Sequence, residues 1–244
     1  MKIIEDIDFF FNYLDSHLSS ISEIKCSKNV DLYKKLVYMA FIDLLSRIVF
    51  PKKSPRDRVI SVLKRFSKWN NGYNVSLPHL LRFLSKTPDP AFEGLRLYVK
   101  TKFKSWSSGE LVTLDRDLDY EETKKLWPQE KEYKIPIEDV SLDSLTHFHL
   151  FYSYRNSLVH ELRPPSTSFD REHHQEPFYM HLTNFDAELK PKEHHWVLNY
   201  PIKFFDNISR TLHKEIKEYF VKNEINPYDL FIFGEYWLES LNKK

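Results

Sequence analysis

Glycine is scarce in this chain, and its scarcity limits the folds that the sequence can adopt. Only 4 of the 244 residues are glycine. An all-β fold needs many tight turns, and turns use glycine because its backbone reaches positive φ without a steric penalty. The low count therefore favours long helices. No GxGxxG or GxxxxGK[ST] pattern occurs, so the usual dinucleotide and mononucleotide phosphate loops are absent.

Apolar residues recur at spacings of three and four along the first half of the chain, as on the buried face of an amphipathic helix. The first such face is formed by Ile7, Phe10, Phe11, Leu14, Leu18 and Ile21. Pro51 ends the second helix, and Ser54 with Asp57 forms a capping box that starts the third. The pattern predicts helices at 4–24, 30–49, 54–69, 77–86 and 91–105.

The second half is less uniform. Residues 106–140 are acidic and irregular, with a short helix expected near 120–127. Ser141 is expected to cap a strong helix over 141–162. Two short strands, 178–183 and 196–200, are expected to pair as a hairpin. A long helix opens at Pro201, and a short apolar element follows at 228–241. The sequence thus predicts one mainly α domain over 1–244, a helical bundle with a small β-hairpin appended at about 176–200 and C-terminal helices to about 241.

Positive charge is concentrated in one segment of a chain whose net charge is only +1. Residues 51–104 hold 13 Lys/Arg against 3 Asp/Glu, whereas residues 105–150 hold 5 against 11. A local excess of ten positive charges attracts polyanions such as RNA. The candidate RNA contacts are Lys64, Arg65, Lys68, Arg96, Lys100 and Lys104. In the alternative interpretation these side chains lie on solvated helix faces and pair in part with the acidic segment.

Cysteine usage and hydropathy indicate a cytoplasmic protein. Cys26 is the single cysteine, so the chain forms no internal disulfide and no site of several thiolates for a metal. The N-terminal residues include acids and lack the small-residue cleavage site of a signal peptide. No apolar run approaches the roughly 18 residues that a membrane-spanning helix needs. We therefore expect no membrane association, and no metal or cofactor is expected either.

Arg155 and His160, near the end of the predicted 141–162 helix, suit phosphodiester chemistry. An imidazole titrates near neutral pH and can take or give a proton, and a guanidinium can hold a phosphate with two hydrogen bonds. Asn156 can orient either group. RNA carries its own nucleophile, the 2′-hydroxyl, so no metal is required. Five residues at about 100° each separate the two side chains by about 140° around an ideal helix, so either the long Arg155 side chain reaches round the helix or a second chain completes the site.

The segment 154–160, Tyr-Arg-Asn-Ser-Leu-Val-His, resembles the signature of the HEPN superfamily, an arginine followed four to six residues later by a histidine. Members are helical bundles, and many are metal-independent endoribonucleases that act as toxins or in antiviral defence. They usually dimerise so that two motifs face one cleft. The resemblance implies that this chain is an endoribonuclease and that it forms a homodimer. As a member of a toxin–antitoxin pair, it would also have a cognate antitoxin or regulatory protein as its partner. It implies that Arg155 and His160 are catalytic or contact RNA, assisted by Asn156.

Two alternatives remain beside catalysis. The chain could be a noncatalytic HEPN-like module that binds RNA or a protein partner. Arg155 could instead pair with Glu161 or with carbonyls at the helix end, and His160 could simply suit the negative end of the helix. Four histidines in two adjacent pairs could bind zinc, although polar loop residues are the simpler interpretation. These are His173, His174, His194 and His195. Packing or surface roles are expected for His147 and His149.

Overall fold

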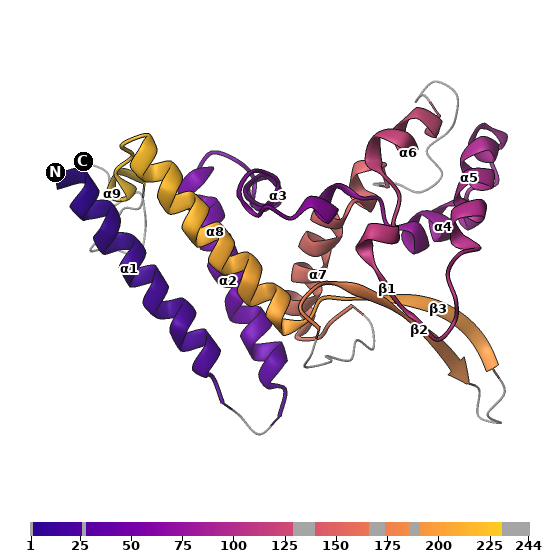
Figure 1. Cartoon of the computed structure of the whole chain (residues 1–244), viewed down its shortest axis with the longest axis horizontal. Coiled ribbons are helices and arrows are strands. Elements are labelled where there is room, and N and C mark those ends of the chain that lie inside the picture. Colours follow the sequence, from indigo (N-terminus) through magenta and orange to yellow (C-terminus); the bar gives the residue numbers. More distant parts are fainter. Residues whose placement is uncertain (1, 26–27, 129–139, 166–173, 186–190, 231–244) are drawn as a thin grey trace. The chain divides into compact units, whose positions relative to one another are not determined.

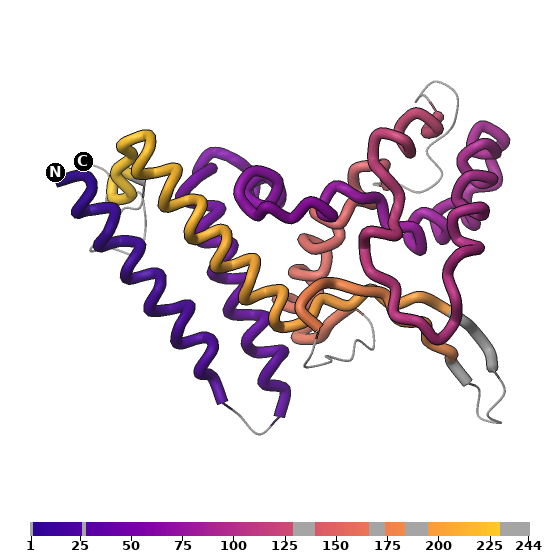
Figure 2. The backbone as a smooth tube through the Cα atoms, viewed as in Figure 1, coloured from indigo at the N-terminus to yellow at the C-terminus, as the bar shows by residue number. Residues whose placement is uncertain are grey.

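A computed structural model describes residues 2–25, 28–128, 140–165, 174–185 and 191–230. These residues form two compact units (Figures 1 and 2). Unit 1 contains the described residues of the ranges Met1–Lys68 and Phe205–Lys244, and unit 2 contains those of Trp69–Phe204. The mainly helical fold with a small antiparallel sheet, predicted from the sequence, is confirmed. No helix in the described parts of the chain is both long and apolar enough to cross a membrane.

The regular elements among the described residues of unit 1 are all helices. They are α1 (Lys2–Glu23), α2 (Val30–Val49), α3 (Pro55–Phe66), all but the first three residues of α8 (Ile202–Lys222), and α9 (Pro227–Leu230). The apolar face expected for the first helix is buried. The Phe11 ring meets Phe220 of α8 at 5.7 Å between centroids, and the Tyr38 hydroxyl of α2 donates to Asp206 at 2.8 Å. The Ser54 hydroxyl accepts the backbone N–H of Asp57, as the capping box predicts.

Unit 2 combines short helices with the sheet. Its helices are α4 (Leu77–Lys86), α5 (Glu93–Phe103), α6 (Tyr120–Leu126) and α7 (His147–Glu161), and its strands are β1 (Leu111–Thr113), β2 (Phe178–Phe185) and β3 (Pro191–Asn199). Short 3-10 turns lie at Asn70–Tyr73, Pro90–Phe92, Leu114–Arg116 and Asp143–Leu145. The strand order is β1-β2-β3, with both pairs antiparallel.

The predicted hairpin is confirmed, and it is longer than expected. Tyr179 pairs with Leu198, and Leu182 pairs with His195. Strand β1, which the sequence did not predict, joins the free edge of β2 through Val112 opposite Tyr179. This three-residue strand lies within the acidic 106–140 segment, of which 129–139 fall outside the described residues. Most of the predicted 228–241 element lies outside them as well.

The helix expected from 141 begins only at His147. Ser141 and Ser144 exchange hydrogen bonds between backbone N–H and side-chain oxygen, and these close a 3-10 turn instead of capping α7. Thr146 is then held extended, because Val75 forms β-bridges to both Thr146 and Leu118. The prediction of a helix start at Ser141 was therefore wrong, since a pairing distant in sequence overrides the local start signal.

Aromatic side chains form the core of unit 2 around Trp69. The Trp69 ring lies 5.4 Å from Phe148 and 4.9 Å from Phe204 between centroids. Phe148 also contacts Tyr73 at 4.8 Å, and it lies so close to Gly72 that an added Cβ would be 2.3 Å from its ring. Glycine is therefore required at position 72 for this packing.

Candidate functional site

The predicted motif lies on the last turns of α7. Arg155 is half-buried, its Nη1 donates to Asn156 Oδ1 at 3.3 Å, and its guanidinium lies 5.9 Å from the Tyr152 ring centroid. His160 is exposed. The helix ends at Glu161, and Leu162 follows in the left-handed conformation with φ 52°.

One chain does not bring Arg155 and His160 together. They lie on opposite flanks of a regular helix, about 140° apart, and no hydrogen bond joins these two described residues. Glu161, the acid considered as an alternative partner of Arg155, forms an ion pair with Arg163 at 2.6 Å. The structure thus leaves His160 accessible and packs Arg155 against its own helix.

The six predicted RNA contacts are divided between the two units. Lys64, Arg65 and Lys68 are exposed residues of unit 1. The Arg65 guanidinium lies 4.5 Å from the Tyr219 ring centroid. Lys68 forms an ion pair with Glu215, and this hydrogen bond raises the pKa of Lys68. Arg65 and Lys68 therefore already contact other side chains of their own unit.

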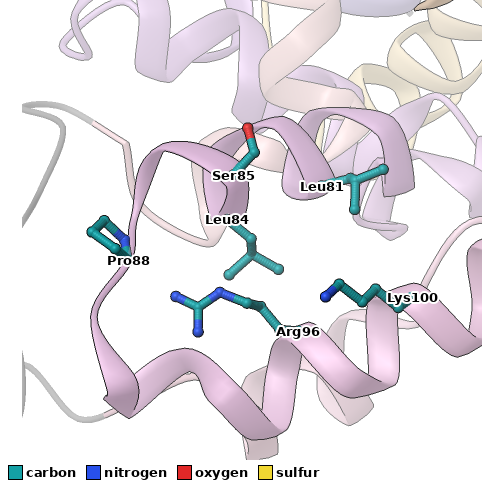
Figure 3. Close-up of a pocket in the computed structure, with 6 residues that line it drawn as sticks. All are labelled: Leu81, Leu84, Ser85, Pro88, Arg96 and Lys100. Atoms are coloured by element: carbon teal, nitrogen blue, oxygen red, sulfur yellow. The ribbon is translucent and has the colours of Figure 1, made fainter.

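Arg96, Lys100 and Lys104 belong to unit 2, and the first two line a cavity of about 360 Å³ between α4 and α5 (Figure 3). The Arg96 guanidinium donates to the carbonyl oxygens of Thr87 and Asp89, the latter at 3.0 Å. It also forms a 2.7 Å ion pair with Glu93. Arg96 therefore ties the α4–α5 connection together, whereas Lys100 and Lys104 are exposed.

A second cavity, of about 290 Å³, lies beside α7 and was not predicted. Its polar lining comes from three elements: His79 from α4, Ser153 and Ser157 from α7, and His195 from β3. Aromatic side chains, including Trp196, complete the wall. The sequence indicated that His195 is a polar loop residue or, less simply, a zinc ligand, and nothing in the sequence spacing connects it with His79.

His160 lies on the flank of α7 that lines this second cavity. It follows Ser157 by three residues and Ser153 by seven, and both spacings place side chains on one face of a helix. Two imidazoles, those of His79 and His195, therefore line this cavity, and helical spacing places His160 on the face of α7 that carries the two lining serines. Arg155 points to the other flank.

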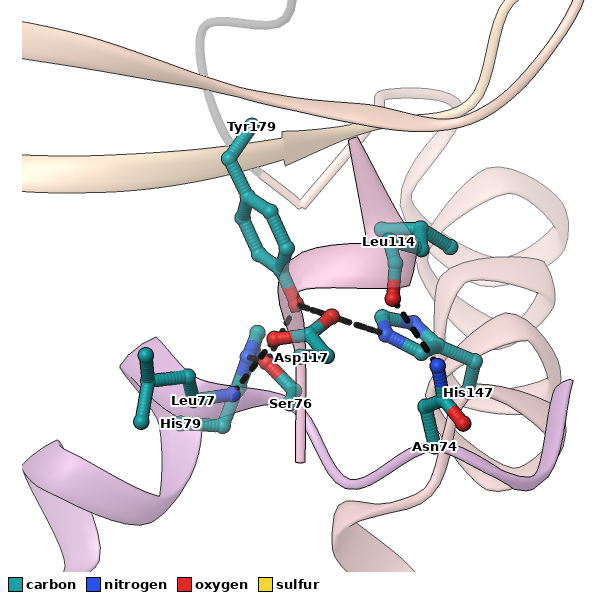
Figure 4. A network of polar contacts seen from close by, with 8 residues as sticks. All are labelled: Asn74, Ser76, Leu77, His79, Leu114, Asp117, His147 and Tyr179. Carbon is teal, nitrogen blue, oxygen red and sulfur yellow. Dashed lines mark hydrogen bonds and ion pairs between the residues drawn. The ribbon is translucent and has the colours of Figure 1, made fainter. Parts of the chain in front are cut away.

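A buried hydrogen-bond network connects His79 with the interior of unit 2 (Figure 4). The Ser76 hydroxyl lies 2.7 Å from His79 Nδ1 and 2.6 Å from the Tyr179 hydroxyl. The Tyr179 hydroxyl donates to Asp117 Oδ2 at 2.9 Å, and His147 Nε2 lies 2.6 Å from the same oxygen. The side chains of His147 and Asp117 are 0% exposed, so the packing role expected for His147 includes a buried polar contact.

Pairing between distant segments builds this network. Val75 pairs with Leu118 through hydrogen bonds of 2.8 and 3.1 Å, and the Ser76 N–H donates to the Leu145 carbonyl at 3.0 Å. These bonds hold the segment before α4 against the segments that carry Asp117 and His147. The Asn74 side chain adds a 2.9 Å hydrogen bond to the Leu114 carbonyl.

Burial and the network set the protonation of two members. Burial, with a smaller effect of Asp117, raises the pKa of the Tyr179 hydroxyl well above its usual value, so Tyr179 stays a donor. Close packing, with a smaller effect of His147, lowers the pKa of His79 to about 4. The His79 residue is solvent-exposed, and this exposure opposes the lowering of its pKa. Both at the lowered pKa and at the ordinary value of about 6.5, the ring is mostly neutral near pH 7.

Within the described ranges, no three His, Cys, Asp or Glu residues are grouped as they would be around a metal ion. His173, one of the histidines considered for zinc, lies outside these ranges. Comparison of the chain with models of protein families, with curated proteins and with solved structures finds no match.

Proposed function

We propose that this protein acts on RNA at the cavity beside α7, as a metal-independent endoribonuclease that uses His160. The observation that carries the proposal is the position of His160, exposed on the α7 flank whose serines line a cavity that also holds His79 and His195. Cleavage by the 2′-hydroxyl of RNA needs one group to accept a proton and another to donate one. Neighbouring imidazoles are suited to both roles near neutral pH.

The cavity wall also suits an unpaired base. Trp196 is half-buried and lines the cavity, as does Tyr154 of α7. Aromatic faces stack on bases whatever their sequence, at roughly 1–3 kcal/mol per base. The exposed cations Lys100 and Lys104 of the same unit can attract the phosphate backbone. Single-stranded RNA is therefore the expected substrate.

Arg155 contributes across a dimer in this proposal. It lies on the flank of α7 opposite His160, so in this proposal it acts at a site that a second chain completes. Asn156 would hold its guanidinium in place through the 3.3 Å hydrogen bond. A homodimeric ribonuclease of this kind would suit a toxin or defence protein in the cytoplasm, controlled by an antitoxin or another regulatory protein.

A noncatalytic RNA- or protein-binding module is the second candidate. It is favoured by the packing of Arg155 against Tyr152 and Asn156, because a guanidinium held on its own helix can serve structure alone. This candidate and the first predict different consequences of removing the His160 imidazole.

Cleavage of total cellular RNA in EDTA, by the wild type and by His160→Ala, tests the proposal. The matched control is His17→Ala, which removes an exposed imidazole from α1 in unit 1. We expect the wild type and the control to cut RNA and His160→Ala to be at least about 100-fold slower, the usual contribution of one proton-transfer group. Equal cleavage by all three proteins would contradict the role of His160, and no cleavage by the wild type would leave the binding module.

A further inference from the structure

His79 occupies a special position in the cavity beside α7. One ring nitrogen, Nδ1, lies 2.7 Å from the Ser76 hydroxyl, in a chain that continues through Tyr179 to the buried carboxylate of Asp117 (Figure 4). The residue is solvent-exposed and lines the cavity. The chain of hydrogen bonds thus connects a buried negative charge with a solvent-accessible imidazole.

The direction of the hydrogen bonds follows from the chemistry of the groups. A carboxylate only accepts, so the single phenolic proton of Tyr179 is donated to Asp117. The Tyr179 oxygen must then accept from the Ser76 hydroxyl, 2.6 Å away. Ser76 has no second proton to donate, so it accepts from the Nδ1–H of His79. The ring therefore carries its proton on Nδ1 and its lone pair on Nε2.

Two further donors hold Asp117 as the charged end of the chain. The backbone N–H of Leu77, at the first turn of the ten-residue helix α4, donates to Oδ1 at 2.7 Å. The imidazole of His147 lies 2.6 Å from Oδ2. The carboxylate oxygens accept from all of these groups, so Asp117 is the acceptor at the end of the hydrogen-bond chain. Contacts from α4 and α7, together with that from β2, therefore fix the direction of the hydrogen bonds between Asp117 and His79.

We propose that His79 is the general base of RNA cleavage at this cavity, and that Ser76, Tyr179 and Asp117 are positioning residues that fix its tautomer. The inference rests on the proposed function and names the group that activates the nucleophile. An imidazole with Nδ1–H directed to a carboxylate, here through two hydroxyls, and Nε2 open to substrate is the arrangement by which catalytic triads orient their base.

The proposed step conserves atoms and charge without a metal. His79 Nε2 takes the proton of the ribose 2′-hydroxyl, and the 2′-oxygen forms a bond to phosphorus. The bond from phosphorus to the 5′-oxygen breaks, and its electron pair stays on that oxygen. His160, protonated at the start, gives the 5′-oxygen a proton. The products are a 2′,3′-cyclic phosphate and a 5′-hydroxyl, so the ribose 2′-hydroxyl is the group that defines the substrate.

Cleavage of a single-stranded RNA oligonucleotide in EDTA by His79→Gln is the first test. Glutamine keeps much of the side-chain size but accepts no proton, and His17→Gln is the matched control in unit 1. We expect His79→Gln to lower kcat by about 100-fold or more while KM changes little, and the control to match the wild type. Full activity of a folded His79→Gln would overturn the inference while leaving the proposed ribonuclease intact. A wild type that cuts no RNA would overturn both.

The tautomer of His79 is the second test, and it needs no RNA. Nitrogen-15 NMR of the imidazole in the whole protein distinguishes Nδ1–H from Nε2–H. We expect Nδ1–H in the wild type, and loss of that preference in Ser76→Ala together with a cleavage rate lower by about tenfold or more, as a mis-set tautomer entails. An Nε2–H tautomer in the wild type, or an unchanged tautomer in Ser76→Ala, would overturn the positioning chain whatever the result with RNA.

Discussion

Replacement of Asp117 tests the energetic role of the buried network. The carboxylate is 0% exposed and accepts hydrogen bonds from Leu77 N–H at 2.7 Å, from Tyr179 at 2.9 Å and from His147 at 2.6 Å. Asp117→Ala leaves these three buried donors without their acceptor. Each such donor costs about 1–3 kcal/mol, so the expected loss is about 3–9 kcal/mol. A domain has only about 5–15 kcal/mol in total, so the folded state should be severely destabilised.

Asp117→Asn should fall between the wild type and Asp117→Ala. An amide of the same shape keeps one acceptor oxygen and turns an NH₂ group toward the remaining donors. If its oxygen faces Tyr179 and His147, one donor loses its partner, at a cost of about 1–3 kcal/mol. Asp115→Asn is the matched control, because Asp115 is an exposed carboxylate two residues away.

Urea unfolding followed by tryptophan fluorescence measures these effects. Trp69 reports on the region, because its ring centroid lies 6.1 Å from that of His147. We expect the midpoint to fall in the order Asp115→Asn, Asp117→Asn, Asp117→Ala. The reasoning would be refuted if Asp117→Ala unfolded within about 0.5 kcal/mol of the wild type, the usual range for a surface substitution.

Three further predictions follow from other contacts. Gly72→Ala should lower the free energy of unfolding in the same urea titration by about 1–3 kcal/mol, because the new Cβ would lie 2.3 Å from a buried ring. The control Gly94→Ala, in open space on α5, should be neutral or stabilising. Equal effects of the two substitutions would contradict this packing. Burial, then a hydrogen bond to a carboxylate, raises the pKa of Tyr120 from 10 to about 12. The contribution of the Tyr120 phenol to stability is therefore complete below pH 10 and lost between about pH 10 and 12. Absorbance at 295 nm should show a phenol that titrates near 12. Titration of Tyr120 near 10 would contradict the burial and the hydrogen bond. Subunit mixing tests whether a dimer shares the site. Inactive Arg155→Ala and His160→Ala proteins, once their subunits exchange, should together recover part of the wild-type cleavage rate. A mixture as inactive as its components would exclude a shared site.

The sequence predicts local features of this fold better than long-range ones. The first helix follows from apolar spacing, and the hairpin follows from two β-rich runs whose pairing needs no distant partner. Strand β1 has three residues and exists only because β2 offers an edge, so local preference could not indicate it. The late start of α7 has a similar cause, since Val75 bridges Thr146 across some seventy positions of sequence.

Some residues of the candidate site are likewise indicated by a local sequence pattern, and others are connected only by the fold. His160 stood out because of its spacing from Arg155, and the structure leaves it exposed while it holds Arg155 on another flank of the helix. His79 and Asp117 belong to no motif, and only folding connects them, through Ser76 and Tyr179. The charge excess in 51–104 singled out Arg96 as a candidate RNA contact, but it could not show that Arg96 binds the connection between α4 and α5.

The most direct test of the account is an NMR titration of the full chain with a 2′-O-methyl RNA oligonucleotide, which binds but lacks the nucleophile. The account predicts saturable shifts of the imidazole signals of His79 and His160 and of the Trp196 indole, with His17 in unit 1 unchanged. Saturable binding that leaves these three side chains unperturbed, or no binding at low ionic strength, would contradict the claim that RNA is handled at the cavity beside α7.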